Sequence, residues 1–264
     1  MTTRPGVLRR KNLRWTPLDS GRGPFTLRQS ITLTRRFPRR RRGFFYGLAI
    51  DVIWPMLVFG TRLSFRGTEH LPASGGVLVA SNHLSYADPT TLTAFCLSAG
   101  RVPRYLAKAD LWRLPLVGSI MSGGGHIPVH RGKPTASGAY RDAVGAVRRG
   151  ECVAIFPEGG FSKDSEHWPV RGKTGIARIA LETGVPVVPV ANWGTHELLP
   201  QGSPLPRFLR RPRVQLVAGP PVELSDLVGA DPTAAVLREA TDRIMVAVTT
   251  LLGEVRGQTP PVTR

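Results

Sequence analysis

Beyond residue 60, short apolar runs alternate along the chain with longer stretches in which apolar residues recur every three or four positions. The first pattern predicts buried strands, and the second predicts helices that pack on one face. The predicted strands cover residues 76–80, 127–129, 152–156, 187–191 and 214–218. The predicted helices cover residues 88–99, 134–149, 173–182 and 234–255. Strands and helices in alternation indicate βαβ units, and therefore an α/β fold with a mostly parallel sheet flanked by helices.

Residues 44–60 have a different pattern, because this stretch is apolar apart from Asp51 and is interrupted by Pro55. It is shorter than the roughly 20 residues that a membrane-spanning helix needs, and an acid near its centre would be costly in hydrocarbon. A helix that lies in one face of a membrane fits this pattern. We therefore expect a membrane-associating helical segment at 44–60, with a helix buried against the rest of the chain as the alternative.

Charge separates the N-terminal part of the chain from the remainder. The protein has 36 basic and 18 acidic residues, a formal net charge of +18, and the first 43 positions hold thirteen of the basic residues but only one acid, Asp19. We therefore expect a flexible basic arm at 1–43, followed by the membrane-associating segment and an α/β domain at 61–264. A basic arm binds polyanions, either nucleic acid or an anionic membrane surface. The apolar segment that follows the arginines favours the membrane over nucleic acid.

Two further features bear on location. The arm is longer than the basic region of a signal peptide, and no cleavage site follows the apolar stretch. Cys96 and Cys152 have neither metal nor redox spacing, so we expect them to be reduced core residues. We therefore predict a peripheral or monotopic protein on the cytoplasmic face of the cell membrane. The Pro- and Arg-rich stretch Gln201–Arg213 is either a second membrane contact or a solvated basic loop.

Candidate chemistry lies directly after the first predicted strand. His83 follows that strand, and reactive groups collect at the carboxyl ends of strands in open α/β sheets. Asp88, at the predicted N-cap of the next helix, can fold back onto the imidazole and fix its tautomer. No serine or cysteine nucleophile stands beside the pair, so it suits deprotonation of a substrate hydroxyl. The alternative is a helix cap next to a hydrogen-bonded loop histidine.

Two other motifs follow strands in the same way. Glu158 is presented at a tight turn in Phe156–Ser162, and Gly125–Arg131 ends in a cation that can meet a phosphate. His126 and His130 lack a third ligand nearby, so we expect no metal site.

In order and spacing these motifs resemble the four blocks of the glycerolipid acyltransferase superfamily. The blocks are Asn82–Asp88 with the His-x4-Asp pattern, Gly125–Arg131, Phe156–Gly159 and Val185–Ala191. A segment that begins at Lys108 is also similar to a family segment. The resemblance covers roughly residues 62–220.

The resemblance implies a transferase of phospholipid biosynthesis. Such an enzyme moves a fatty acyl group from acyl-CoA or acyl carrier protein to the free hydroxyl of a lysophospholipid. The acceptor implied first is 1-acylglycerol-3-phosphate, with phosphatidic acid as the product. No bound cofactor is implied, and His83 and Asp88 would form the catalytic pair.

The resemblance also implies residues that bind substrate. Glu158 and Gly159 would lie at the acceptor, and Arg131 and Lys108 would bind its phosphate.

One departure from the family pattern concerns the third block. The family continues with Thr-Arg-Ser after Glu-Gly, whereas this chain has Gly160, Phe161 and Ser162. A phosphate-binding arginine is therefore missing, and Lys163, Arg171 and Lys173 are candidate replacements. The alternatives are another lysolipid or a glycolipid as acceptor, or a catalytically inactive relative that binds membranes or other polyanions.

Overall fold

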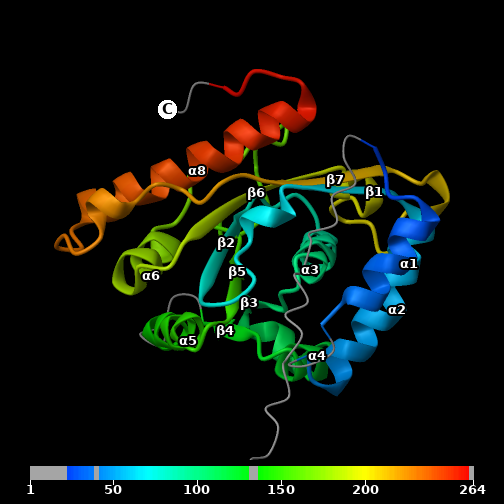
Figure 1. Cartoon of the computed structure of the whole chain (residues 1–264), viewed down its shortest axis with the longest axis horizontal. Helices are drawn as coiled ribbons and strands as arrows, with labels where there is room; N and C mark the ends of the chain where they lie inside the picture. The colour runs from blue at the N-terminus through cyan, green and yellow to red at the C-terminus, as the bar shows by residue number, and fades with distance from the viewer. Residues whose placement is uncertain (1–22, 39–41, 131–135, 262–264) are drawn as a thin grey trace, which may run out of the picture.

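The structure is a computed structural model that describes residues 23–38, 42–130 and 136–261. Its centre is a single sheet in the order β1-β7-β6-β2-β5-β3-β4 (Figure 1). The strands are β1 (Arg62–Arg66), β2 (Val77–Ser81), β3 (Pro103–Lys108), β4 (Ile127–Val129), β5 (Cys152–Ile155), β6 (Val187–Trp193) and β7 (Arg213–Ala218). Every neighbouring pair is parallel except β6 and β7. The predicted α/β fold with a mostly parallel sheet is confirmed.

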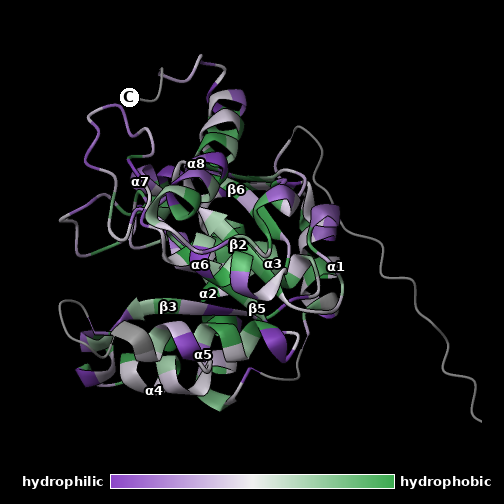
Figure 2. Cartoon of the chain, turned by 90° about the vertical axis from the view of Figure 1, so that its left-hand side faces the viewer, coloured by the Kyte–Doolittle hydropathy of each residue, from purple (hydrophilic) through white to green (hydrophobic). Residues whose placement is uncertain are grey.

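Helices cover both faces of this sheet (Figure 1). They are α1 (Leu27–Arg36), α2 (Phe44–Gly60), α3 (Asp88–Ser98), α4 (Val117–Gly123), α5 (Ala136–Arg148), α6 (Gly175–Thr183), α7 (Thr195–Leu198) and α8 (Ala234–Arg256). The side chains of β2 alternate between two cores: Val77 and Val79 pack with α1, α2 and α3, whereas Leu78 and Ala80 pack with α5, α6 and α8. Figure 2 shows the apolar strands enclosed at the centre of these layers.

Two strands were not predicted, and both differ from the apolar runs that mark the others. In β1, Arg62 is exposed while Leu63 and Phe65 are buried, and β3 likewise mixes polar with apolar side chains. Both lie toward the edges of the sheet, where a strand needs less apolar sequence.

Part of the predicted flexible arm is folded. A capping box between Thr26 and Gln29 begins helix α1, and Leu33 of this helix is fully buried. Trp54 of α2 donates a hydrogen bond from its indole N–H to the Thr34 hydroxyl at 2.6 Å. The expectation of a flexible arm is therefore wrong for residues 27–36, while 1–22 and 39–41 lie outside the described residues.

Helix α2 is apolar on two opposite sides. One side is buried, with Tyr46, Ile50, Trp54 and Leu57. The other side is exposed, with Phe45, Leu48, Val52, Met56 and Phe59. Packing on the domain accounts for the first side only. Among the described helices, none is long and apolar enough to cross a membrane.

We predict that Gly194→Ala destabilises the fold more than Gly184→Ala. Both glycines have positive φ angles, 91° and 65°, but a Cβ at Gly194 would lie 1.9 Å from the Arg213 carbonyl oxygen, whereas one at Gly184 would meet nothing within 4 Å. Backbone strain alone should cost about 1 kcal/mol, and the clash should add roughly 1–3 kcal/mol. Urea unfolding of the two variants measures this difference. Equal losses would contradict a close approach of β7 to Gly194.

Candidate active site

His83 and Asp88 form a hydrogen-bonded pair at the carboxyl edge of the sheet. The imidazole Nδ1 lies 2.8 Å from the Asp88 Oδ2 atom. The Asp88 side chain is fully buried, whereas the His83 side chain is 17% exposed and lines a cavity. The pair therefore has the geometry that the sequence predicted, with the histidine facing open space and the acid behind it.

Asp88 is not the N-cap of the following helix, contrary to the prediction. It is the first residue of α3, and the N-cap position is held by Ala87. Its Oδ2 atom instead accepts from the backbone N–H groups of Leu84 and Ser85, as well as from His83. Because a carboxylate surrounded by donors can only accept, Nδ1 of His83 is the donor in this pair, and the neutral form of the ring then has its lone pair on Nε2.

Sequence reasoning missed Asn192, which supplies another donor to the same carboxylate. Its amide Nδ2 lies 3.1 Å from the Asp88 Oδ1 atom. The Asn192 backbone also exchanges two hydrogen bonds, of 2.8 and 2.9 Å, with the buried side chain of Asn82. These contacts fasten the end of β6 to the end of β2. A polar residue at the end of the apolar run of β6 was the available signal.

Glu158 holds the backbone on both sides of the site. One carboxylate oxygen accepts from the His83 N–H at 2.8 Å, and the other accepts from the Val170 N–H at 3.0 Å. Burial raises the pKa of Glu158 to about 7, although the two backbone hydrogen bonds oppose this shift. Glu158 does not line the cavity, so its expected contact with an acceptor stays a prediction.

Aromatic rings surround the imidazole. Phe156 stacks on His83 with ring centres 4.2 Å apart, and Phe161 approaches at 4.4 Å. The exposed ring of Tyr86 meets Phe161 edge to face at 4.7 Å. Phe161, which occupies the place of the family arginine, therefore touches the candidate base directly.

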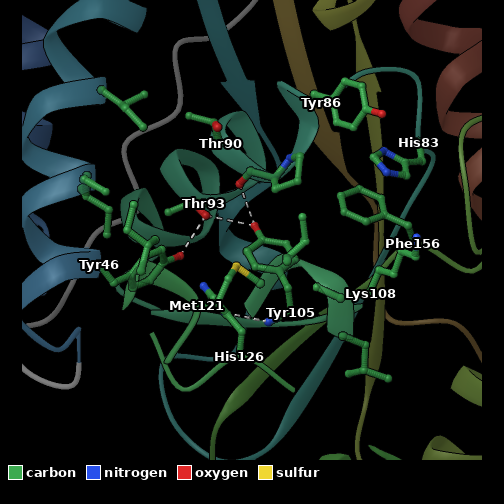
Figure 3. A pocket seen from close by; sticks show the side chains of 18 of the residues that line it. Tyr46, His83, Tyr86, Thr90, Thr93, Tyr105, Lys108, Met121, His126 and Phe156 are labelled. Atoms are coloured by element: carbon green, nitrogen blue, oxygen red, sulfur yellow. Dashed lines mark hydrogen bonds between the residues drawn. The ribbon is translucent and has the colours of Figure 1, made fainter. Parts of the chain in front are cut away.

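An apolar cavity of about 690 Å³ opens beside His83, between α2, α3 and β3 (Figure 3). Its wall contains a chain of hydrogen bonds, in which the Thr93 hydroxyl joins the hydroxyls of Tyr46 and Tyr105, and Tyr105 donates to the Pro89 carbonyl. Those polar groups are paired with one another, so the cavity offers a mostly apolar surface with the candidate base in its wall. An aliphatic chain fits such a space.

The residues that were expected to bind the acceptor differ in their positions relative to the cavity. Lys108 lines the cavity, and its ammonium pairs with Asp110 at 2.6 Å. Gly159 also lines the cavity and has a positive φ of 72°. The side chain of Lys173 lies against Gly159, where an added Cβ would be 2.7 Å from its Nζ atom. Arg131 lies outside the described residues.

The two candidate histidine ligands do not form a metal site in the part of the chain that the structure describes. His126 is buried and accepts a hydrogen bond on Nδ1 from the Tyr105 N–H, whereas His130 is exposed. Burial lowers the pKa of His126 to about 4, so the ring is neutral near pH 7. Within the described ranges, no three His, Cys, Asp or Glu residues gather as metal ligands.

Comparison with known proteins places this site in a family. The family model described as Acyltransferase matches residues 62–193. A chloroplastic 1-acyl-sn-glycerol-3-phosphate acyltransferase of Brassica napus is 34% identical over 171 residues, which are 63% of this chain and 47% of the relative. A 1-acyl-sn-glycerol-3-phosphate acyltransferase of Bacillus subtilis is 30% identical over 173 residues, 62% of this chain and 78% of the relative.

A solved structure has a similar fold. The crystal structure of the 1-acyl-sn-glycerophosphate acyltransferase PlsC from Thermotoga maritima matches with a TM-score of 0.57 and 24% identity, over 88% of this chain and 89% of that one. The chain spans about half the length of several relatives that it matches, including the one from Brassica napus. The extent of the family match and the coverage of the Bacillus subtilis relative show that the chain belongs to the acyltransferase family and resembles its glycerolipid-acylating members.

Proposed function

We propose that the protein is an O-acyltransferase that acylates the free hydroxyl of a lysophospholipid, with 1-acylglycerol-3-phosphate as acceptor and phosphatidic acid as product. The donor would be acyl-CoA or acyl carrier protein. The observation that carries the proposal is the His83–Asp88 pair, whose histidine lines a mostly apolar cavity of about 690 Å³. The names of the relatives from Brassica napus and Bacillus subtilis support the choice of acceptor.

The pair would act as a general base and then as a general acid. His83 Nε2 takes the proton of the acceptor hydroxyl as its oxygen attacks the thioester carbonyl carbon. The C–S bond then breaks, the new ester remains on the acceptor, and the imidazolium returns its proton to the thiolate. Asp88 keeps Nδ1 protonated throughout and stabilises the imidazolium. No acyl-enzyme forms in this scheme, and the one serine of the motif, Ser85, donates its hydroxyl to the Leu199 carbonyl and not to the His83 ring.

Other described groups would position the substrates. The apolar cavity would take a fatty acyl chain, and Lys108 at its rim would bind the acceptor phosphate together with Arg131. Glu158 would act mainly as a brace, because it fixes the backbone of His83 to that of Val170.

A second candidate function differs in the head group of the acceptor. Phe161 and Tyr86 make the rim beside His83 aromatic where the family has a cation. That rim favours a lysolipid with another head group, or a glycolipid, because sugar rings and choline groups bind aromatic faces. Lys173 beside Gly159 favours phosphate instead.

The protein would work on the cytoplasmic face of the cell membrane, as a peripheral or monotopic protein. The exposed apolar side of α2 would enter the interface, and the basic residues of the N-terminal arm would bind anionic lipid. In this organisation residues 1–43 and 44–60 attach the 61–264 domain to its lipid substrate.

We predict that His83→Ala lowers turnover by roughly a hundredfold to ten-thousandfold, because it removes the general base. Thiol release from a long-chain acyl-CoA, measured across a panel of lysolipid acceptors, tests this, and His70→Ala is the matched control. The acceptor that supports release identifies the head group. A protein that releases no thiol from acyl-CoA or from acyl carrier protein, with any acceptor, would be an inactive relative and would contradict the proposal.

We predict that titration of Glu158 makes the unfolding free energy of the protein depend on pH. Its pKa is raised from 4.5 to about 7 in the folded protein, so between these values the folded state holds a proton that the unfolded state has lost. Stability from this group therefore falls as pH rises through that window, and Glu158→Gln removes the effect. The unfolding free energy of the wild type minus that of the variant should fall by roughly 2 kcal/mol between about pH 5 and pH 8. Urea unfolding at both pH values measures it, and a constant difference would refute it.

A further inference from the structure

The loop between α7 and β7 presents two leucines to solvent. Leu205 is 72% exposed and Leu209 is 102% exposed. Single exposed apolar side chains are common, but two such leucines in one short loop form an apolar patch of the kind that marks a contact surface. We call residues 204–211 the leucine loop.

Arginines surround these leucines. Arg207, Arg210 and Arg211 are all exposed. Among the ion pairs between described residues, none involves these three side chains. Their guanidinium groups are therefore available to anions outside the chain. Exposed arginines beside exposed leucines are complementary to the surface of an anionic bilayer, in which phosphates lie above hydrocarbon.

The leucine loop is fixed at the end of α2. Phe208, in the middle of the loop, packs so closely on Gly60 that an added Cβ there would lie 2.2 Å from its ring. Gly60 is the last residue of α2, and Phe59 before it is 64% exposed. The loop therefore begins where the exposed apolar side of α2 ends, and Figure 1 shows α2 and the loop before β7 on the same side of the molecule.

The residues just before the leucine loop are joined to the loop that carries His83. The Ser85 hydroxyl donates to the Leu199 carbonyl at 2.6 Å, and the Gln201 amide donates to the Leu84 carbonyl at 3.2 Å. Leu84 and Ser85 are the residues whose N–H groups bind Asp88. A contact made by the leucine loop would therefore hold the mouth of the active site close to whatever surface the loop binds.

We propose that the leucine loop is a second membrane contact, which inserts Leu205 and Leu209 into an anionic bilayer while its arginines bind lipid phosphates. The inference rests on the proposed membrane-associated acyltransferase function and adds a membrane contact at the C-terminal end of α2, beside Gly60. A nucleic acid would use the arginines but would leave both leucines in water. Of the two interpretations that the sequence left open for Gln201–Arg213, the exposed leucines favour the membrane contact.

A fluorescent label at position 209 tests insertion directly. Leu209→Cys can be labelled selectively with an environment-sensitive dye, because Cys96 and Cys152 are buried. Val246→Cys, at a 48% exposed position on α8, is the matched control on the other face of the sheet. Vesicles of mixed phosphatidylcholine and phosphatidylglycerol should brighten and blue-shift the label at 209 but not at 246. A label at 209 that stays aqueous on bound protein would overturn the proposal.

Affinity provides a second measurement. The double variant Leu205→Ser and Leu209→Ser should sediment with the same vesicles roughly tenfold more weakly, since each leucine loses its apolar burial. Val228→Ser with Val246→Ser is the control, and the thermal unfolding midpoint checks that each variant folds. Unchanged sedimentation of the leucine variant would contradict the proposal while leaving membrane association through α2 intact. A wild-type protein that binds no vesicle would refute membrane association itself, whereas thiol release tests the chemistry separately.

Arginine substitution distinguishes the partner. Glutamine at Arg207, Arg210 and Arg211 should weaken binding to the anionic vesicles and make the remaining binding less sensitive to salt. If the substitution instead abolished retention of duplex DNA and left vesicle binding unchanged, the loop would be a nucleic-acid contact and the proposal would be wrong.

Discussion

The buried carboxylate of Asp88 is the contact on which the rest of the site depends. It collects donors from the loop after β2 and from Asn192 at the end of β6, and it holds the His83 ring. A buried carboxylate is stable only when protein donors replace the hydrogen bonds that it would make to water. The fold must therefore bring these segments together around Asp88. The parallel arrangement of β2 and β6 does this, because it places their carboxyl ends side by side.

Helix α2 contributes both to the cavity and to the outer surface of the protein. Helix α2 packs one side over α3 and closes the cavity, while its other side stays apolar and exposed. An aliphatic chain in the cavity would reach the base from this direction. The rim combines aromatic rings with Lys108, so under the proposed function side chains outside the His83–Asp88 pair would select the head group.

The sequence predicts those features that local pattern encodes. His83 and Asp88 are five residues apart, from the loop after β2 to the first residue of α3, and β2, β5 and β6 are apolar runs, so both the pair and the central strands are visible in the sequence. Asn192 is not visible in this way, because its link to Asp88 joins residues 104 positions apart. The hydrogen bonds of Glu158 could not be predicted for a similar reason, since its partners are backbone N–H groups that no side-chain pattern reveals. The segment around α1 illustrates the opposite error: its arginines suggested an arm, while the buried side of the helix is marked by one apolar residue, Leu33, beside the polar Ser30.

The central claim is that Asp88 holds the His83 ring with Nδ1 protonated and Nε2 free to take a proton. Nitrogen-15 NMR of the histidine rings measures this directly, at a pH where the His83 ring is neutral, with His83→Ala to assign its signals. The account predicts a protonated Nδ1 and an unprotonated Nε2 in the wild type, and loss of this preference in Asp88→Asn. A wild-type ring protonated on Nε2 instead would leave no base facing the cavity and would contradict the account.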